Sequence, residues 1–394
     1  MLGPLHISLN SREILIMKYW PFFDKLWKAV MGQRKKLAAK PKPWRINLIL
    51  HITYSAWLLI KTKVIQKFQT SKDLEYRTFI DLLDNLIPLT LEIYANLFRG
   101  GFFDYYIESI FRIWCLFRRM RRKNYDKAPL IFLSDIIYWE TIGHPLFESM
   151  RNNLPFFNEY FVENFHSSLR RQTSHKILNH EGLRKDAFVV DALRKENNFS
   201  NSYIQKEQYP WKGKKLQNLI FLTGDFLLKF FSQLYHNQNK SYIIEYNTGR
   251  RRLKYPQYFF ATLNTKVDVM LLPTGYNSDQ PPSSEKFCDF DQCSILSDME
   301  SSRQVLICGH AYHSDCLKTL NFICLPCTRY FCDGIKKLSQ SFIDRLSKGV
   351  LEDSSILEEE DDDRIIDEDN DMFEDEIGEN ILAQEKFFHS LSLF

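Results

Sequence analysis

The spacing of cysteine and histidine near the end of the chain constrains its fold more than any other feature. The segment CGHAYHSDC, residues 308–316, holds two cysteines and two histidines, in a chain of 394 residues with eight cysteines and ten histidines. Seven of the eight cysteines fall between Cys288 and Cys332. In a reducing compartment, such a cluster of thiol and imidazole groups is typical of a metal site rather than of disulfides.

Eight side chains of this region are candidate ligands for two zinc ions. Zinc is bound by thiolate sulfur and imidazole nitrogen in closed sites of four ligands, so eight ligands predict two structural ions with no position left for water. In chain order the candidates are Cys288, Cys293, Cys308, His310, His313, Cys316, Cys324 and Cys327. Cys332 falls outside the pattern, and Cys115 lies in an apolar segment that is typical of a buried thiol.

The order of these residues resembles the RING family of zinc fingers, of the kind with two histidines. The resemblance implies a cross-brace, in which alternate ligand pairs share an ion. It assigns Cys288, Cys293, His313 and Cys316 to the first zinc, and Cys308, His310, Cys324 and Cys327 to the second. The first pair departs from the family, because CDFDQC places four residues between its cysteines where two are usual. Cys293 is our expected second ligand, and the carboxylate of Asp291 is the alternative.

The RING resemblance also implies a docking surface for a partner protein. Many RING modules are ubiquitin ligases that dock a ubiquitin-conjugating enzyme and form no covalent intermediate of their own. The family pattern places Phe290 and Phe322 on this surface, together with Pro326 of the last knuckle, although Pro326 stands one position later than in the family. Arg329 also comes one residue late, and the Cys316–Cys324 span is short. The module is therefore expected to act as a ubiquitin ligase or as an adaptor with the same fold.

The rest of the chain is predicted to be mainly α. Apolar residues recur at helical spacing, and the expected helices are Arg12–Met31, Arg45–Phe68, Lys72–Phe98, Phe103–Arg122, Ala128–Trp139, Asn158–Arg171 and Leu216–Tyr235. Residues 240–272 alternate in a way that predicts two or three short strands. The predicted organisation is a basic helical body (1–272), a linker (273–286), the RING-like finger (287–345) and an acidic, largely disordered tail (350–394).

Several body segments resemble proteins that are encoded by mobile elements of fungi and some invertebrates and can end in a RING-like finger. These segments are GPLHISLNSRE (3–13), KKLAAKPKPWRINLIL (35–50), NYDKAPLIFLSDIIYW (124–139) and NEYFVENFHSSLRRQTS (158–174). The resemblance implies a transposase-like body, whose chemistry would need clustered carboxylates. The acids Asp135, Glu163 and Asp225 and the nearby His166 show no metal-binding spacing, so we assign no catalytic residue.

The net charge of +3 averages two unlike parts of the chain. Residues 351–394 hold 17 of the 49 acidic residues and 2 of the 52 basic ones, which leaves 32 acidic and 50 basic residues before them. Basic clusters lie at Arg34–Arg45, Arg118–Lys123, Leu169–Lys176 and Arg250–Lys254, with Trp44 available to stack on bases. They indicate either a surface for nucleic-acid phosphates or an ordinary solvated basic face.

No segment of the sequence predicts secretion or a membrane span. The first residues, MLGPLHISLN, lack the basic leader of a signal peptide. The most apolar run, Ile46–Ile60, is interrupted by polar residues and falls short of the roughly 18 to 20 apolar residues that a bilayer needs. We therefore expect an intracellular protein, nuclear or cytoplasmic, without a membrane partner.

Overall fold

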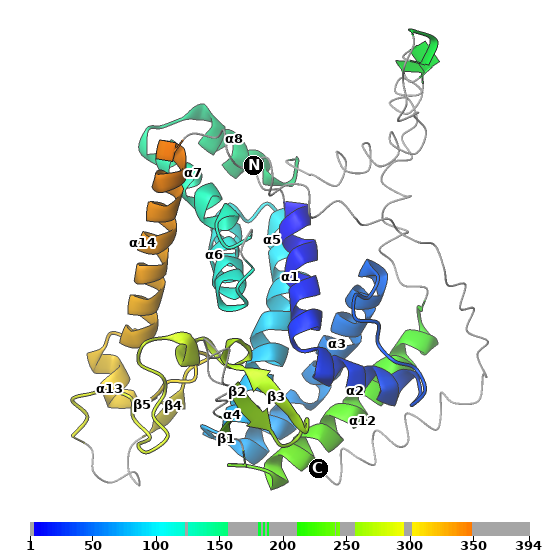
Figure 1. Cartoon of the computed structure of the whole chain (residues 1–394), viewed down its shortest axis with the longest axis vertical. Helices are drawn as coiled ribbons and strands as arrows, with labels where there is room; N and C mark the ends of the chain where they lie inside the picture. The colour runs from blue at the N-terminus through cyan, green and yellow to red at the C-terminus, as the bar shows by residue number, and fades with distance from the viewer. Residues whose placement is uncertain are drawn as a thin grey trace.

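A computed structural model describes residues 4–122, 125–156, 180–182, 184–185, 187–188, 211–240, 242–244, 257–294 and 302–348. Helices dominate these residues and the strands are few and short, so the mainly α prediction is confirmed (Figure 1). The main helices of the body are α1 (Pro4–Lys18), α2 (Trp20–Met31), α3 (Pro43–Phe68), α4 (Leu74–Asp81), α5 (Tyr94–Arg99), α6 (Phe103–Arg119), α7 (Ala128–Thr141), α8 (Pro145–Asn153) and α12 (Lys214–His236). A short turn, η3 (Leu154–Phe156), follows α8.

The predicted helix Arg12–Met31 is two helices that meet at a bend. Tyr19 leaves the helical conformation with φ −95° and ψ 24°, and Pro21 occupies the first turn of α2. A proline is tolerated there because the first amides of a helix have no partner within it. The bend turns α2 away from α1 and directs Phe22 and Phe23 of α2 into the core.

The predicted helix Lys72–Phe98 is one long helical run with two wide turns. The π turns η1 (Leu82–Leu86) and η2 (Leu89–Ile93) lie between α4 and α5, on either side of Pro88. A proline inside a helix lacks an amide donor, and its ring presses on the carbonyl group four residues earlier. A wider turn relieves that contact. The run begins at Asp73, whose side chain accepts a hydrogen bond of 2.8 Å from the amide of Tyr76.

Helices α3 and α12 form the centre of the body and run in the same direction. The Trp44 and Trp211 rings meet near their first turns at 5.9 Å between centroids, and the Phe68 and Tyr235 rings meet near their ends at 5.3 Å. Among the described residues, α3 is the one helix with the length and composition of a membrane span, and half of its most apolar stretch is buried. Helix α3 has 26 residues, so the predicted helix Arg45–Phe68 begins two residues earlier than expected and ends at the expected residue.

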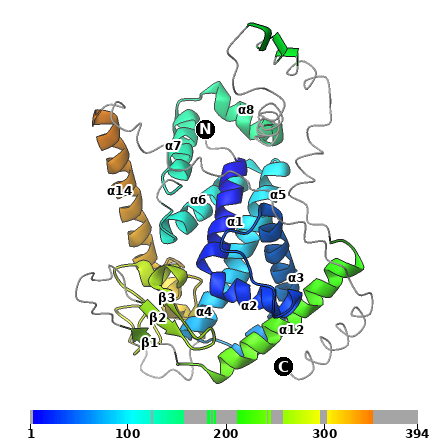
Figure 2. The ribbon, with the colours of Figure 1, turned by 45° about the vertical axis from the view of Figure 1, so that its right-hand side comes forward.

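A small antiparallel sheet and the segment that follows it connect the body to the cysteine-rich region. Strands β1 (Tyr242–Ile244), β2 (Gln257–Phe260) and β3 (Thr265–Asp268) lie in that order, with Phe259 opposite Lys266 (Figure 2). Two short turns follow, η4 (Val269–Leu271) and η5 (Thr274–Asn277). Within the expected linker 273–286, Tyr276 packs on the core of the body and the amide of Gly275 donates to Cys308 O at 2.8 Å. This segment therefore contacts both parts.

The cysteine-rich region contains two short strands and two helices, β4 (Arg303–Val305), β5 (Ala311–His313), α13 (Ser314–Thr319) and α14 (Leu325–Lys348). Residues 288–294 and 302–348 are called the Cys/His module below. Helix α14 extends away from the rest of the module and runs beside α6 (Figure 1), where the Phe331 ring lies 6.0 Å from that of Trp114. The sequence analysis did not predict α8 or α14. The predicted helix Asn158–Arg171 and the acidic tail lie outside the described residues.

Candidate metal centre

The hairpin β4–β5 positions the middle ligands of the Cys/His module. The strands pair antiparallel, with Arg303 opposite His313 and Val305 opposite Ala311. Cys308 and His310 lie in the turn, which the amide of Leu306 closes by donating to His310 O at 2.8 Å. Gly309 lies between them with φ +95°, a backbone conformation that residues with a Cβ rarely adopt. A Cβ added at this position would also lie 2.9 Å from the Tyr276 ring. A glycine is therefore required at the centre of this turn.

The structure gathers the eight candidate ligands into two groups of four. In each group the sulfur and ring-nitrogen atoms all lie within 4.8 Å of one another. The first group is Cys288, Cys293, His313 and Cys316, and the second is Cys308, His310, Cys324 and Cys327. Along the chain, successive ligand pairs belong alternately to the first and the second group. Each group therefore brings together two segments between which a ligand pair of the other group lies in the sequence. Either group could hold one metal ion.

The distances within the groups fit a tetrahedral zinc ion. With Zn–S of about 2.3 Å and Zn–N of about 2.0 to 2.1 Å, the edges of a tetrahedron are about 3.8 Å between two sulfurs and about 3.5 Å between sulfur and nitrogen. In the first group, Cys293 Sγ lies 3.7 Å from Cys316 Sγ and 3.4 Å from His313 Nδ1. In the second, Cys308 Sγ lies 3.7 Å from Cys324 Sγ and 3.5 Å from His310 Nδ1. No disulfide joins these cysteines.

The charges of the two groups call for a cation. Burial lowers the pKa of His310, but its hydrogen bonds with the Cys308 and Cys324 thiols outweigh burial and raise that pKa to about 10. Burial and the neighbouring Cys293 and Cys288 thiols raise the pKa of Cys316 to about 12. Thiols this close resist ionising together, because each thiolate repels the next. A bound divalent cation removes that repulsion, so metal binding and thiol deprotonation are coupled.

Hydrogen bonds outside the two groups orient the ligands. The Nε2 of His310 donates to Gln280 O at 2.9 Å, so Nδ1 faces the three sulfurs and can bind a metal ion once its own proton is lost. Asp289, next to the first ligand, accepts from the amides of Ser283 at 2.8 Å and Ala311 at 2.7 Å. Sequence analysis assigned no role to Asp289 or Gln280, because their partners lie in segments whose proximity only the fold creates.

The last ligand pair lies at the start of α14. Cys324 precedes the helix, and its carbonyl oxygen accepts from the Thr328 amide at 3.0 Å, while Cys327 lies in the first turn. Amide groups at a helix start carry partial positive charge, which stabilises a thiolate there. The small core under the ligands contains Tyr312, which is 1% exposed and whose hydroxyl lies 3.4 Å from Cys324 Sγ.

The body holds the Cys/His module through two cationic side chains of its α4 region. Lys72 Nζ donates to the carbonyl oxygens of Ser283 at 2.8 Å and Phe287 at 3.0 Å, directly before the first ligand. Arg77 Nη2 donates to Leu306 O at 2.9 Å, two residues before Cys308. Each of these contacts fixes the backbone beside a different ligand group, so both groups are tied to the body.

The remaining sulfur and carboxylate candidates lie outside the two groups. Asp291 is exposed and belongs to neither group, whereas Cys293 lies in the first. Cys332 is exposed on α14. Cys115 is in α6 and is half-buried rather than fully buried, and its partial burial raises its pKa to about 12.

The expected docking residues differ in exposure. Phe322 is 68% exposed, and the adjacent Ile323 and Leu325 are also exposed. Phe290 packs against the small core of the module, and Pro326 is half-buried at the start of α14. The most exposed apolar group of the expected surface is therefore the loop that leads into the last ligand pair.

The acids considered for nuclease chemistry do not form a site in the described structure. Asp135 is exposed on α7, and Asp225 pairs with Lys229 at 2.6 Å along α12. Glu163 and His166 lie outside the described residues. Among the residues that the structure describes, the two groups above are the Cys, His, Asp and Glu clusters that could hold a metal.

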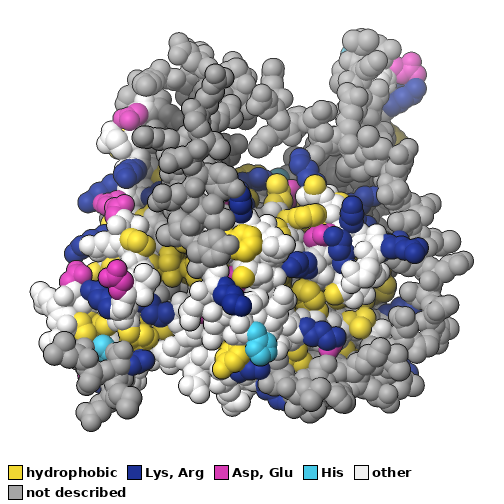
Figure 3. All heavy atoms as spheres, turned by 60° about the horizontal axis from the view of Figure 1, so that its bottom comes forward, with side chains coloured by type: hydrophobic (Ala, Val, Ile, Leu, Met, Phe, Trp, Pro, Cys, Tyr) yellow, Lys and Arg dark blue, Asp and Glu magenta, His cyan; other side chains and the backbone are white. Residues whose placement is uncertain are grey.

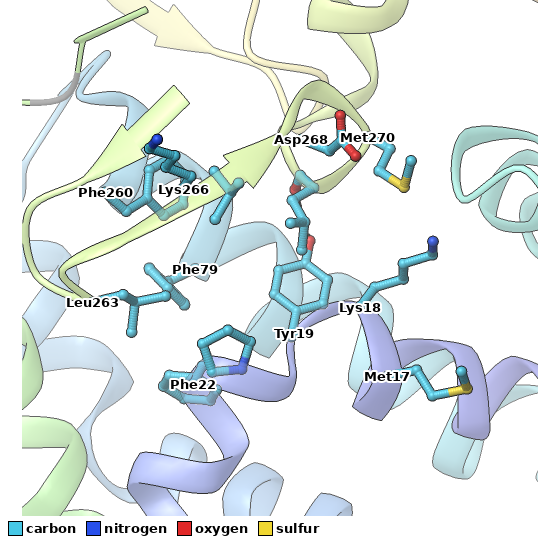
Figure 4. Close-up of a pocket in the computed structure, with 13 residues that line it drawn as sticks. Met17, Lys18, Tyr19, Phe22, Phe79, Phe260, Leu263, Lys266, Asp268 and Met270 are labelled. Carbon is cyan, nitrogen blue, oxygen red and sulfur yellow. Dashed lines mark hydrogen bonds between the residues drawn. The ribbon is translucent and has the colours of Figure 1, made fainter. Parts of the chain in front are cut away.

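A hollow of about 220 Å³ opens between the α1–α2 bend and the β2–β3 hairpin (Figure 4). Phe79 and Leu263 line one side of it, and Lys18, Tyr19 and Asp268 lie on the other. Burial lowers the pKa of Lys18, which Asp268 partly offsets. Its lining residues include no cysteine, serine, threonine or histidine, and its titratable side chains are Lys18, Tyr19, Lys266 and Asp268.

Three arginines of the basic cluster Arg118–Lys123 contact side chains of the body or of α14. Arg119 is 3% exposed and pairs with Asp81 at 2.5 Å. The Arg118 guanidinium lies 5.0 Å from the centre of the Tyr330 ring, and Arg122 pairs with Glu13 at 3.3 Å. These three arginines bind side chains of the protein itself, which favours a structural role for this cluster over phosphate contacts.

The chain was compared with protein-family models, with curated proteins and with solved structures, and none of the three comparisons gave a match. The resemblances to RING fingers and to mobile-element proteins therefore depend on the motifs of the chain itself. The geometry of the two ligand groups is the most specific observation that bears on function.

Proposed function

We propose that this chain is a zinc protein of the RING type, whose Cys/His module docks a ubiquitin-conjugating enzyme. The observation that carries the proposal is the alternation of the ligand groups. Cys288 and Cys293 join His313 and Cys316, while the intervening pair Cys308 and His310 joins Cys324 and Cys327. Alternate sharing of ligand pairs is the cross-brace of the RING family, and the donor distances fit zinc.

The exposed loop before the last ligand pair supports a docking role. Asn321 and Phe322 both have positive φ, 52° and 60°, which is strained for residues with a Cβ. The Phe322 amide donates to Leu317 O at 2.9 Å, which fixes this backbone while the ring stays 68% exposed. A fixed backbone at positive φ that presents an exposed aromatic ring is typical of a binding site.

The attachment of the module to the body leaves this loop accessible in the described structure. Lys72 of the body contacts residues 283–287, directly before the module, and Asp289 within it, while Arg77 contacts residues 305–306 and α6 contacts residues 330–331 of α14. None of these contacts uses Phe322, Ile323 or Leu325, which are 68%, 46% and 39% exposed. A partner protein therefore has access to all three.

The alternative within the same proposal is an adaptor that docks a partner without promoting ubiquitin transfer. The late position of Pro326, in the first turn of α14, and the short Cys316–Cys324 span favour it. Both forms use the same zinc-dependent surface, so they differ only in what the docked partner does.

The test combines metal content with ubiquitin transfer. The full chain, purified under reducing conditions without chelator, should contain two zinc ions, and a panel of conjugating enzymes should yield ubiquitin chains that Phe322→Ala abolishes. Ile307→Ala is the matched control, because Ile307 is a 58% exposed apolar residue elsewhere on the module. Two zinc ions without transfer or binding by any enzyme of the panel would favour the adaptor. A chain that contains no zinc would overturn the proposal.

A further inference from the structure

The body carries a basic patch built from two stretches that are far apart in the sequence. The loop between α2 and α3 exposes Arg34, Lys35, Lys36, Lys40 and Lys42. The start of α12 exposes Lys212, Lys214 and Lys215. These eight residues are called the basic patch below. Only the first stretch forms a conspicuous cluster in the sequence.

The fold places the two stretches side by side. Because α3 and α12 run in the same direction, their first turns are neighbours, joined by the Trp44 and Trp211 rings at 5.9 Å. Trp44 was expected from the sequence to be available for stacking on bases. In the structure it packs at this contact between the two helices. The Leu37 amide donates to Asp24 Oδ1 at 3.0 Å, which fixes the α2–α3 loop to α2. The patch is thus held in place by packing and hydrogen bonds.

The charged side chains in the two stretches that form the basic patch are all positive. Neither stretch, 32–45 or 211–217, contains an acidic residue. The residues before the two helices, Lys42 and Gly213, provide no side-chain cap, and neither helix has an acid in its first turn. The partial positive charges at the two helix starts therefore add to the exposed cations. The face shown in Figure 3 carries many Lys and Arg side chains, with acidic side chains interspersed among them.

We infer that the basic patch binds the phosphate backbone of nucleic acid without reading its sequence. This inference goes beyond the proposed function, since it concerns the body and not the Cys/His module. Lysines and arginines that lie close together bind the regularly spaced phosphates of nucleic acid. Counterions that were condensed on those phosphates are released, and this release favours binding. A membrane surface fits less well, because it also needs apolar side chains that enter the lipid. None of the large apolar residues exposed in the described structure belongs to either stretch.

The test is a titration of fluorescein-labelled duplex DNA of mixed sequence with the full, zinc-loaded chain at several salt concentrations. The affinity should fall as salt rises, with a logarithmic slope of about −0.9 for each phosphate neutralised. The variants Lys40→Glu with Lys42→Glu and Lys212→Glu with Lys214→Glu should each weaken binding by about tenfold or more and flatten the slope. Zinc content and circular dichroism verify that each variant is folded.

The matched control reverses two exposed lysines on another surface, Lys336→Glu with Lys337→Glu on α14. It changes the net charge equally, so it should leave the affinity within about twofold of that of the unchanged protein. An equal loss in the control would show that net charge, not the patch, attracts DNA and would overturn the inference. So would binding that ignores salt, no binding, or equal displacement of the DNA by polyglutamate.

Discussion

The ammonium group of Lys72 in the body lies 3.0 Å from the carbonyl oxygen of Phe287, the residue before the first ligand. It also donates to Ser283 O and Lys286 O, and the side chain is 18% exposed. The body and the segment that leads into the Cys/His module therefore share one half-buried cation, and the loss of that cation should destabilise both.

Lys72→Met should lower the free energy of unfolding of the zinc-loaded chain by about 1 to 3 kcal/mol, because carbonyl groups lose a charged donor and stay buried. Urea unfolding measures the change. Lys229→Met is the control, since Lys229 is 73% exposed and its pair with Asp225 is worth only about 0.3 to 0.5 kcal/mol. If the two variants lose the same stability, Lys72 does not hold the module to the body.

The carboxylate of Asp289 should prove necessary for tight metal binding. It accepts from the Ser283 and Ala311 amides, and its own amide donates to Ala311 O at 2.7 Å. In Asp289→Asn one of these amides would face an NH₂ group, and the ligand backbone would loosen. We expect zinc affinity to fall by about 10- to 100-fold, as for other outer partners of metal ligands. Competition with a chromophoric chelator measures it.

The exposed neighbour Asp291 provides the comparison for Asp289. Asp291→Asn should leave zinc affinity unchanged within about twofold, although it removes the same charge two residues away. Loss of affinity in both variants would indicate that net charge near the site, and not the hydrogen bonds of Asp289, retains the metal.

The sequence predicted the local features of the metal centre and missed those created by the fold. The ligand spacing from Cys308 to Cys327 is local information, and the structure gathers these residues as that spacing suggests. Lys72 contacts residues more than two hundred positions away, so no local sequence pattern could predict this contact. Helix α14 had a readable signal in the helical spacing of Phe331, Ile335, Leu338 and Phe342, which the cysteine pattern directly before it obscured.

Charge clusters in the sequence were the least reliable guide to the surface. The cluster Arg118–Lys123 suggested a contact with phosphates. Arg119 is nevertheless 3% exposed, because its guanidinium group pairs with the buried carboxylate of Asp81. Conversely, Lys212, Lys214 and Lys215 form no conspicuous cluster in the sequence, but the parallel course of α3 and α12 places them beside Lys42. Burial and proximity decide the role of a charge, and both are properties of the three-dimensional fold.

The buried pair Arg119–Asp81 should be the most sensitive ion pair of the body to single substitution. Asp81 Oδ2 lies 2.5 Å from Arg119 Nη1, and both side chains are at most 3% exposed. Asp81→Asn leaves the guanidinium without its counter-charge and should cost about 3 to 5 kcal/mol in thermal or urea unfolding. Glu108→Gln, which removes the exposed partner of Arg112, should cost less than about 0.5 kcal/mol. Similar losses would contradict the assigned role of burial.

His51 should make the body less stable in mild acid. Burial lowers the pKa of His51 from its usual 6.5, and Glu92 only partly opposes this. Between the folded pKa and 6.5 the unfolded chain binds more protons, so stability falls as the pH drops through that window. The stability advantage of the unchanged protein over His51→Gln should therefore shrink between pH 7 and about pH 5.

The pH experiment needs a control for zinc release, since acid also protonates the ligands of the module. That release affects the unchanged protein and the variant alike, so the difference between them isolates His51. A constant difference between the unchanged protein and His51→Gln over this range would mean that the pKa of His51 is the same in the folded and unfolded chain.

The zinc stoichiometry should distinguish Cys293 from Asp291 as the second ligand. Cys293 Sγ lies 3.4 Å from His313 Nδ1 and 3.7 Å from Cys316 Sγ, whereas Asp291 is exposed and outside the group. Cys293→Ser should reduce the zinc content from two ions per chain to about one, because a hydroxyl group is a poor replacement for a thiolate ligand. Cys332→Ser, an exposed cysteine outside both groups, should retain both ions. If Cys293→Ser keeps two ions while Asp291→Asn loses one, the carboxylate is the ligand and the first site must rearrange around it.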